Sequence, residues 1–396
     1  MSKIIKTLAI ETSCDDTSIG IVTFDGETFA VEKIFAYTQV KDHDMYGGVV
    51  PEIASRLHSD QIIPVLQAIG LEKIQEVDCI SVTTHPGLPG SLLVGESIAN
   101  MLGEYFNKPV VEVNHIVGHI VSLFLDRKLS EIQFPMLVLT VSGGHNDLYL
   151  VNKDRFLPSQ EGQGYVTQSE SEESSKSCMD SSAKPQNNKT SAEQMGSDTF
   201  IRGGFSITKL GTTLDDAAGE CFDKVARMLG GPYPGGAWIG QQALKGKENP
   251  EFDFNKIWLS HEAFNFSFSG LKGQIHNLLH KRKQKGRIPT EQEKYDIAYA
   301  FQENVVEVLS KKLVRAAMEY QAPSLAISGG VSANDRRREY INKLAKNEQR
   351  LRNNQPKSVD LGHVWKFDVY KPEKKLYSTD NAAMIGVAGI LKFSNV

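Results

Sequence analysis

The sequence lacks the features that mark several common classes of protein. Its four cysteines lie far apart and include no Cys-x-x-Cys pair, so neither a disulfide framework nor a thiolate zinc site is indicated. No stretch approaches the roughly 18 apolar residues that a membrane-spanning helix needs. The first apolar run, residues 8–10, is too short for the core of a signal peptide. We therefore expect a reduced, cytoplasmic protein with no membrane partner.

Two signatures of nucleotide and peptide chemistry are also missing. The absence of Gly-x-x-x-x-Gly-Lys-Ser/Thr disfavours a P-loop. Without His-Glu-x-x-His, a zincin-type protease would lack its general base. What is present is a chain of 396 residues that are 40% apolar, enough for a sizeable core and for two to three domains or one large two-lobed fold.

The formal net charge of −4 comes from one unusual segment. Residues 159–200 are rich in Ser, Gln, Asn and Glu, show no helical or strand periodicity, and carry seven acidic against three basic residues. This composition predicts a disordered insertion, and the rest of the chain is then neutral. Two basic clusters remain, at residues 281–287 and 336–338. They are either solvated helix ends or surfaces that contact phosphates.

Strands and helices alternate along the chain, which predicts an α/β fold. The patterns predict strands at residues 7–11, 18–24, 79–83, 110–113, 136–141, 147–151 and 325–328, and helices at 55–69, 91–106, 214–229, 297–320 and 337–347. A strand, a polar turn and a second strand open the chain, and the same layout returns at 136–151. This duplication favours two lobes around a central cleft, although two ordinary hairpins in an unrelated α/β protein would give the same pattern.

Three turns of small residues follow predicted strands, at residues 11–17, 142–145 and 328–334. Glycine lets backbone N–H groups approach a ligand closely, and such turns favour phosphate and other anions. Three of them in one chain predict a nucleotide-like ligand between the lobes.

Two histidines, His115 and His119, are four residues apart at the start of a predicted helix. On a helix they share one face, which suits two ligands of one metal, although ordinary core or surface histidines have the same spacing. A third ligand must come from elsewhere. Asp380, ahead of an apolar C-terminal helix, could serve, unless it only caps that helix. Two His and one carboxylate would leave coordination positions open for a substrate.

An acidic stripe and a rigid turn follow one another in the middle of the chain. Asp216, Glu220 and Asp223 recur at helical spacing, as on a solvated helix face. The stripe precedes Gly-Gly-Pro-Tyr-Pro-Gly-Gly at residues 230–236, where so many small residues indicate close packing or a ligand. A carboxylate such as Asp223 could accept hydrogen bonds from the hydroxyls of a ribose.

Eight motifs, taken in order, carry a family resemblance. They are Glu-Thr-Ser-Cys-Asp-Asp-Thr (11–17), Gly-Gly-Val-Val-Pro-Glu (47–52), Pro-Gly-Leu-Pro-Gly-Ser-Leu (86–92), Asn-His-x-x-Gly-His (114–119), Val-Ser-Gly-Gly-His (141–145), Phe-Ser-Phe-Ser-Gly-Leu-Lys (266–272), Gly-Gly-Val-Ser-Ala-Asn (329–334) and Thr-Asp-Asn-Ala-Ala-Met-Ile-Gly (379–386). Together they resemble the universal family of tRNA N6-adenosine threonylcarbamoyltransferases, the TsaD/Kae/Qri group formerly labelled O-sialoglycoprotein endopeptidases. The resemblance covers nearly the whole chain outside the insertion.

The resemblance implies the two-lobed fold of the actin, sugar-kinase and Hsp70 superfamily, with duplicated ribonuclease-H-like subdomains around a nucleotide cleft. Residues 1–113 would form the first lobe, with a C-terminal helix at 380–396 packing back on it. Residues 114–396 would form the second lobe together with the metal and nucleotide cleft.

Carried over residue by residue, the resemblance implies that His115, His119 and Asp380 bind one divalent metal per subunit, with Fe(II) favoured over Zn(II). The implied substrate contacts are Thr140, Val141, Ser142, Gly143, Gly144, Asp223, Gly236 and Asn334. The implied reaction moves the threonylcarbamoyl group from threonylcarbamoyl-AMP to N6 of the adenosine 3′ of the anticodon in ANN-decoding tRNAs and releases AMP. No residue is assigned as catalytic.

The implied partners are tRNA, an accessory paralogue and an ATPase subunit. Four residues depart from the family pattern, and none of them is an implied metal ligand: His85, Asn146, Gly240 and Ser378. Two other classes stay open. A nucleotide-dependent kinase or ATPase of the same superfamily would not need the histidine pair, and a non-catalytic scaffold paralogue would lack the ligand set.

Overall fold

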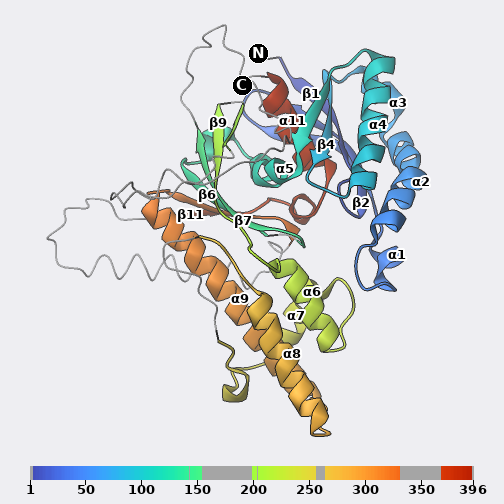
Figure 1. The fold of residues 1–396 in the computed structure, drawn as a ribbon. Helices are drawn as coiled ribbons and strands as arrows, with labels where there is room; N and C mark the ends of the chain where they lie inside the picture. The colour runs from blue at the N-terminus through green and yellow to red at the C-terminus, as the bar shows by residue number, and fades with distance from the viewer. Residues whose placement is uncertain are drawn as a thin grey trace, which may run out of the picture.

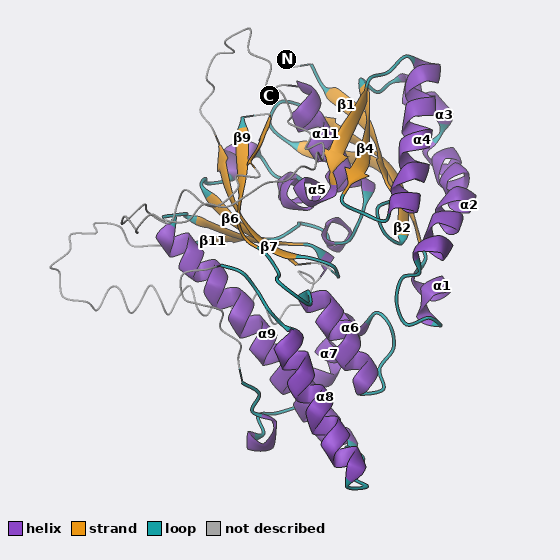
Figure 2. Ribbon diagram, in the orientation of Figure 1, coloured by secondary structure: helices purple, strands orange, loops and turns teal. Residues whose placement is uncertain are grey.

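The computed structural model describes residues 3–141, 143–153, 199–202, 204–255, 264–330 and 367–394. In these ranges, helices cover the outer faces of two mixed β-sheets, and two further helices lie between the sheets (Figures 1 and 2). None of the helices in these ranges is long and apolar enough to cross a membrane.

The first sheet has the strand order β3-β2-β1-β4-β5. Its strands are β1 (Ile5–Glu11), β2 (Asp16–Phe24), β3 (Phe29–Thr38), β4 (Cys79–His85) and β5 (Val110–Asn114). β1 pairs antiparallel with β2 and parallel with β4, and β4 pairs parallel with β5. The carboxyl ends of β1, β4 and β5 therefore lie at the same edge, where both Glu11 and Asn114 end their strands.

The second sheet repeats this layout, with the order β11-β10-β6-β7-β9-β8. Its strands are β6 (Met136–Val141), β7 (Asn146–Lys153), β8 (Thr199–Arg202), β9 (Phe205–Gly211), β10 (Ser324–Ser328) and β11 (Asp368–Tyr370). β6 pairs antiparallel with β7 and parallel with β10, as β1 does with β2 and β4. The duplicated pattern in the sequence is thus a duplicated sheet topology, and the fold class is that of the actin and sugar-kinase proteins.

Helices divide the apolar side chains among three cores. α2 (Pro51–Ile69), α3 (Leu71–Gln75) and α4 (Pro89–Phe106) cover the outer face of the first sheet. α9 (Glu291–Glu319) packs on the second sheet, and α6 (Ala218–Met228), α7 (Gly235–Ala243) and α8 (Ser269–Gln284) extend the same core away from it. The remaining helices are α1 (Val40–Asp44), α5 (His115–Val121), α11 (Ala382–Ser394) and the short 3₁₀ turns Ser122–Phe124, Leu129–Glu131, Pro250–Phe252 and Lys375–Ser378.

The middle core positions the candidate site. It joins α5 and α11 to apolar side chains from both sheets, such as Val22 of β2 and Val138 of β6. α11 packs closely on the first sheet because Gly386 has no side chain: a Cβ there would lie 2.3 Å from Val22. The segment before α11, which contains Asp380, is thereby held beside the carboxyl end of β1.

All seven predicted strands are present, and predicted helices correspond to α2, α4, α5, α6, α9 and α11. α6 begins at Ala218 rather than near residue 214, and α9 begins at Glu291 rather than near 297. Strands β3, β8, β9 and β11 and helices α1, α3, α7 and α8 were not predicted. The predicted helix at 337–347 lies outside the described residues, as does the predicted insertion at 159–200 except for Thr199 and Phe200, which begin β8. The boundary between lobes at residue 113 stays a prediction.

Candidate metal centre and substrate cleft

His115, His119 and Asp380 lie together although more than 260 residues separate the aspartate from the histidines. Their three ligand atoms are all within 4.8 Å of one another. Asp380 Oδ1 lies 3.1 Å from His119 Nε2 and 3.6 Å from His115 Nε2. His119 is fully buried, and 23% of the Asp380 side chain is exposed, so the cluster opens to solvent on the aspartate side.

Local packing explains how this cluster forms. The Asn114 side chain accepts hydrogen bonds from the N–H groups of Ile116 (2.8 Å) and Val117 (3.1 Å), which starts α5 directly at His115. Gly118 then lets α5 approach α11, since a Cβ at this position would lie 2.9 Å from the Ile385 side chain. The small residue between the two histidines therefore brings both imidazoles to the aspartate that precedes α11.

The chemistry of the cluster fits a divalent metal. The buried Nδ1 and Nε2 of His119 form no hydrogen bond of ordinary geometry with any described residue, and the polar contact of Nε2 is with the Asp380 carboxylate at 3.1 Å, a pair of groups that a shared metal ion would satisfy. Burial would raise the pKa of Asp380, but the two histidines outweigh it and hold that pKa below its usual range. Two imidazoles and one carboxylate are a donor set that suits Fe or Zn and leaves positions open.

Glu11, which the sequence left without a role, lies behind His115. Its Oε2 is 3.4 Å from His115 Nδ1, and Ser13 Oγ is 3.0 Å from the same nitrogen. The fully buried Glu11 carboxylate also accepts hydrogen bonds from Ser13 N–H (2.6 Å) and from the Thr83 hydroxyl. Burial would lower the pKa of His115, but Asp380 and Glu11 raise it to about 9. A carboxylate on the far nitrogen orients a ligating histidine and fixes its tautomer.

The second sheet contributes an open backbone turn to the site. A Cβ added at Gly143 or Gly144 would meet nothing within 4 Å, so both backbones border free space. Behind the turn, the buried hydroxyls of Thr140 and Ser328 lie 3.1 Å apart and join the ends of β6 and β10. Burial lowers the pKa of His145, which closes the turn, and the charges of His115 and His119 act in the same direction, so the turn and the histidine cluster lie within electrostatic range of each other. Val141 is buried in β6, and Ser142 lies outside the described residues.

Asp223 and Gly236 lie together at the junction of α6 and α7. The Asp223 carboxylate accepts a hydrogen bond of 2.6 Å from Gly235 N–H. Burial raises its pKa, while the N–H groups of Gly235 and Gly236 and the charge of Arg227 act in the opposite direction. A Cβ at Gly236 would meet nothing within 4 Å, so this helix start also borders free space. Asn334 lies outside the described residues.

The acidic stripe is not the solvated helix face that the spacing predicted. α6 begins at Ala218, so Asp216 precedes the helix. Asp216 instead forms ion pairs with Lys224 (3.2 Å) and with Lys272 of α8. Its neighbour Asp215 accepts hydrogen bonds from Phe268 N–H (2.9 Å) and from hydroxyls of the segment before and within α8. The contacts of Asp215 and Asp216 therefore hold the start of α8 against the segment that precedes α6.

A cavity of about 360 Å³ spans the two lobes beside Asp223. It is lined by residues from both sides: Asp44, Met45, Tyr46 and Gly47 of the first lobe, and Asp223, Arg227, Gly231, Pro232 and Tyr233 of the second. Burial raises the pKa of Tyr233, and Asp15 and Asp223 raise it further, so Tyr233 faces carboxylates of both lobes. This cavity is the part of the cleft that residues of both lobes line.

The turn at residues 14–16 faces the same cleft but supplies no nucleophile. Burial and the charge of Asp15 raise the pKa of the Cys14 thiol far above neutrality, which disfavours the thiolate that would attack a substrate. Burial and Asp15 also raise the pKa of Asp16 to about 7. Covalent catalysis by Cys14 is therefore disfavoured.

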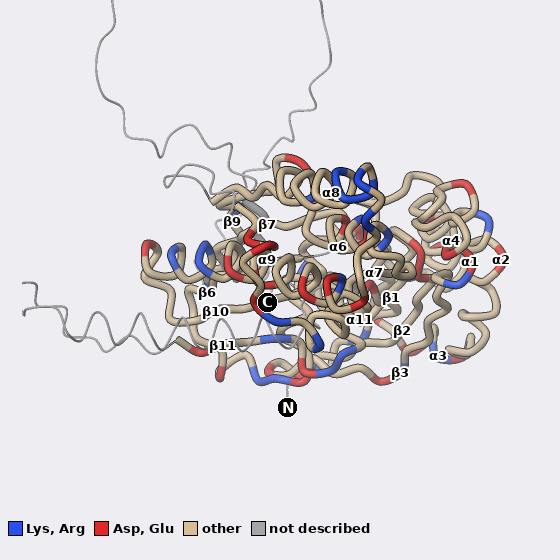
Figure 3. Tube along the Cα trace, turned by 90° about the horizontal axis from the view of Figure 1, so that it is seen from below, with Lys and Arg blue, Asp and Glu red and all other residues tan. Residues whose placement is uncertain are grey.

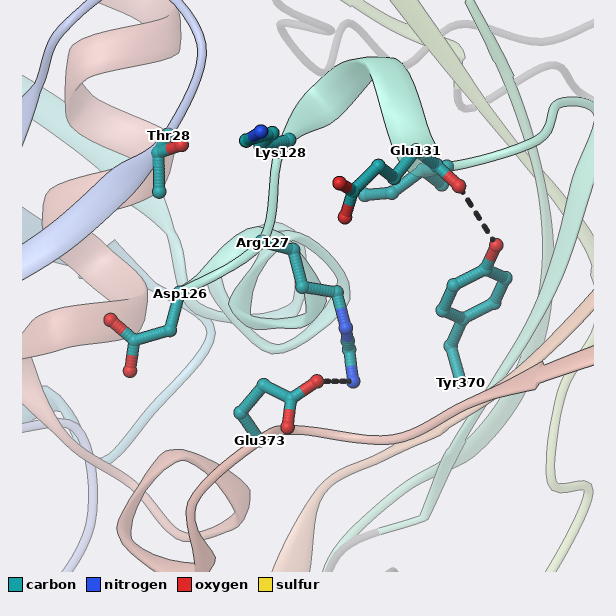
Figure 4. A pocket seen from close by; sticks show the side chains of 8 residues that line it. Thr28, Asp126, Arg127, Lys128, Glu131, Tyr370 and Glu373 are labelled. Carbon is teal, nitrogen blue, oxygen red and sulfur yellow. Dashed lines mark hydrogen bonds and ion pairs between the residues drawn. The ribbon is translucent and has the colours of Figure 1, made fainter.

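A second cavity, of about 500 Å³, lies outside this cleft (Figure 4). Its most buried cation, Arg127, forms an ion pair of 2.6 Å with Glu373 and donates to the carbonyl oxygens of Leu123 and Lys371. The guanidinium also lies 5.4 Å from the centre of the Tyr370 ring. Arg127 is therefore fully engaged within the protein.

The fold and the His-His-Asp cluster define a two-lobed α/β protein with a candidate metal centre facing a backbone cradle. The family model of tRNA N6-adenosine threonylcarbamoyltransferase (TsaD) matches residues 31–174 and 196–387. Enzymes of this name from Staphylococcus aureus strains Newman and COL are each 33% identical over 392 residues, covering 98% of this chain and 92% of theirs. The chain therefore belongs to the tRNA N6-adenosine threonylcarbamoyltransferase family, whose members are transferases that modify tRNA.

A solved structure supports the fold alone. T. kodakarensis HypF matches with a TM-score of 0.51 at 11% identity, covering 98% of this chain and 48% of its own. This chain thus spans about half the length of HypF.

Proposed function

We propose that this chain transfers the threonylcarbamoyl group from threonylcarbamoyl-AMP to N6 of the adenosine 3′ of the anticodon in ANN-decoding tRNAs. In this reaction the N6–C bond forms, the C–O bond to the phosphate breaks, AMP leaves with the electron pair, and N6 loses one proton. The observation that carries the proposal is the juxtaposition of the His115, His119 and Asp380 cluster with the open turn at Gly143 and Gly144.

The side of the cleft next to the first sheet would hold one divalent metal, Fe(II) in preference to Zn(II). His115 and His119 would supply Nε2 and Asp380 a carboxylate oxygen, while Glu11 holds His115 in the required orientation. When bound, such a metal supplies Lewis acidity toward a substrate oxygen. An exocyclic aromatic amine is a poor nucleophile, so an activated carbonyl compensates for the weak attack of N6.

The second-lobe side would hold the adenylate. Backbone N–H groups of residues 142–144 suit its phosphate, with Thr140 and Val141 fixing the end of β6 beneath them. Asp223 suits the ribose hydroxyls, since a carboxylate accepts strong hydrogen bonds, and Gly236 leaves room beside it. Asn334 would complete the contacts. The unpaired anticodon loop can present the acceptor base to the cleft more readily than a duplex can.

A reconstituted reaction tests the proposal. The full chain is combined with threonine, bicarbonate, ATP, the adenylate-forming enzyme, an accessory paralogue, an ATPase subunit and an ANN-decoding tRNA transcript. Threonylcarbamoyladenosine at the position 3′ of the anticodon is the expected product, read by mass spectrometry of nucleosides. Failure to form it, while a relative from Staphylococcus aureus succeeds under the same conditions, would reject the proposal. ATP turnover that survives the loss of both His115 and His119 would instead favour a kinase or ATPase.

A further inference from the structure

Helices α8 and α9 form an arm that projects from the second lobe (Figure 1). The root of the arm lies at the cleft: Lys272 of α8 pairs with Asp216, just before α6, and α6 carries Asp223. α8 has 16 residues and is about 24 Å long at 1.5 Å per residue, so its far end lies well away from the cleft. A ligand that touches both places must be large.

The tip of the arm is rigid. Arg282 is only 9% exposed, pairs with Glu293 of α9 (2.8 Å) and with Glu251, and lies over the Phe252 ring at 5.0 Å. A capping box between Thr290 and Glu293 starts α9. The turn between the helices is closed by the N–H of Arg287, which donates to Arg282 O at 2.9 Å. These contacts hold the backbone of residues 281–293 in one arrangement.

Four other cations on this rigid tip are exposed: Lys281, Lys283, Lys285 and Arg287. None of the four forms an ion pair with a residue in the described ranges. The nearby carboxylates have other partners: Glu251 and Glu293 form ion pairs with Arg282, and Glu291 forms one with Lys294. In the view along the arm, the basic residues gather on α8 (Figure 3). The tip is therefore a patch of unneutralised positive charge, called here the basic tip.

Helix stability accounts for only part of this charge. Cations in the last turn of a helix interact favourably with its dipole, which explains Lys281 and Lys283 on α8. Lys285 is the C-cap residue of α8, where the dipole still favours a cation, but Arg287 lies between the two helices and gains no such stabilisation. Packing offers no reason for Arg287 either, because its side chain is exposed. A polyanionic ligand does give a reason.

We propose that the basic tip binds phosphates of the tRNA substrate while the modified nucleoside occupies the cleft. This assignment rests on the proposed function, because that function supplies an RNA long enough to reach from cleft to tip. Phosphates recur along an RNA strand, and each Lys or Arg that neutralises one releases bound counterions. The tip thus contributes affinity and register without reading sequence.

The test compares two charge-reversal variants of the full chain. One carries Lys281→Glu, Lys283→Glu and Lys285→Glu. The matched control carries Lys128→Glu, Lys371→Glu and Lys375→Glu, three exposed lysines outside the arm. Binding to an unmodified ANN-decoding tRNA transcript is followed by fluorescence anisotropy between about 50 and 200 mM salt, the range over which phosphate contacts weaken most visibly.

For the arm variant we expect at least about a tenfold loss of affinity and a salt slope smaller by about 2 to 3, from three lost contacts at 0.7 to 0.9 each. The control keeps the wild-type slope. A Lys→Gln version of the arm variant, which avoids acidic residues at a helix C-terminus, shifts the slope in the same direction. Wild-type binding by the arm variants, or equal losses in arm variant and control, overturns the proposal.

Failure of the basic-tip proposal can be distinguished from failure of the proposed function. If the wild-type chain leaves tRNA unmodified but binds it with an arm-dependent slope, the function fails and the basic tip stands. If tRNA is modified normally and binding is indifferent to the three lysines, the function stands and the basic tip fails.

Discussion

The two sides of the cleft are built at equivalent strand ends, but one side consists of charged side chains and the other of glycine backbone. At the ends of β1 and β5, the first sheet presents buried, charged side chains, among them Glu11 and His115. At the end of β6, the second sheet presents Gly143 and Gly144, whose backbones border open space. One duplicated topology therefore supports a side-chain site on one side and a backbone site on the other.

This difference has a physical basis. A cation needs lone pairs held at fixed positions, and buried imidazoles and carboxylates provide them. An anion such as a phosphate needs N–H donors at close approach, and glycine provides them by removing the side chain. We therefore expect that substitutions can abolish metal binding without loss of AMP binding, and the reverse.

The largest effect is expected from His119→Ala. Losing a residue that only hydrogen-bonds to a metal ligand lowers metal affinity by about 10- to 100-fold. Removing one of the three candidate ligands itself should therefore lower it by more than about a hundredfold. Transfer to tRNA should fall with it, whereas AMP binding should persist. Mass spectrometry measures the metal content, and calorimetry measures AMP binding. His276→Ala, which removes an exposed histidine of α8, is the control; metal retention by His119→Ala would exclude the site.

Glu11→Gln should weaken metal binding by about 10- to 100-fold, as expected for a carboxylate that orients a ligating histidine. The substitution keeps the shape of the side chain but removes the charge that faces His115 Nδ1. A metal titration measures the effect. Glu32→Gln, which changes a carboxylate on β3, serves as the comparison. Equal metal affinity in both variants would show that Glu11 does not support the cluster.

Gly144→Val places a side chain where the fold leaves free space, so the free energy of unfolding should change by less than about 0.5 kcal/mol. AMP affinity and transfer should both fall at least tenfold, by about 1.4 kcal/mol in binding free energy, while metal content stays at the wild-type level. Gly273→Val, at another open position on α8, controls for the added volume. Normal AMP binding by Gly144→Val would place the ligand elsewhere.

The smallest effect is expected from Asp223→Asn. The amide oxygen can still accept from Gly235 N–H, so α7 should stay in place, but a neutral acceptor binds ribose hydroxyls less strongly. AMP affinity should drop by about threefold to tenfold, in line with about 1 kcal/mol for one hydrogen bond. Calorimetry with AMP and with adenine alone separates the ribose contribution, since adenine binding should not change.

Seven strands from the two sheets could be predicted because their apolar runs are short, β-branched and bounded by polar turns, whereas β3, β8, β9 and β11 were not predicted. The histidine pair could be found by its spacing, and Asp380 was open as its third partner. What the sequence could not show is distance: Asp380 reaches His119 because Gly118 and Gly386 let α11 pack closely on its neighbours. The role of Glu11 depends on the same tertiary contacts.

The helices were harder to predict where polar residues dominate. α8 buries only Leu271, Ile275 and Arg282, so it has no clear apolar stripe. α6 starts late because the residues before it bind the segment that enters α8, through Asp215 and the bridge between Thr213 and Phe266. α9 starts early because the capping box at Thr290 and Glu293 precedes its apolar positions.

A crystal structure of the full chain, soaked with Fe(II) or Zn(II) and a non-hydrolysable analogue of threonylcarbamoyl-AMP, tests the central claim most directly. We expect an anomalous metal peak about 2.0 to 2.2 Å from both histidine Nε2 atoms and from Asp380, with the phosphate against the backbone of Gly143 and Gly144. A metal bound by other residues, or an adenylate held by first-lobe side chains instead of the second-lobe backbone, would contradict it.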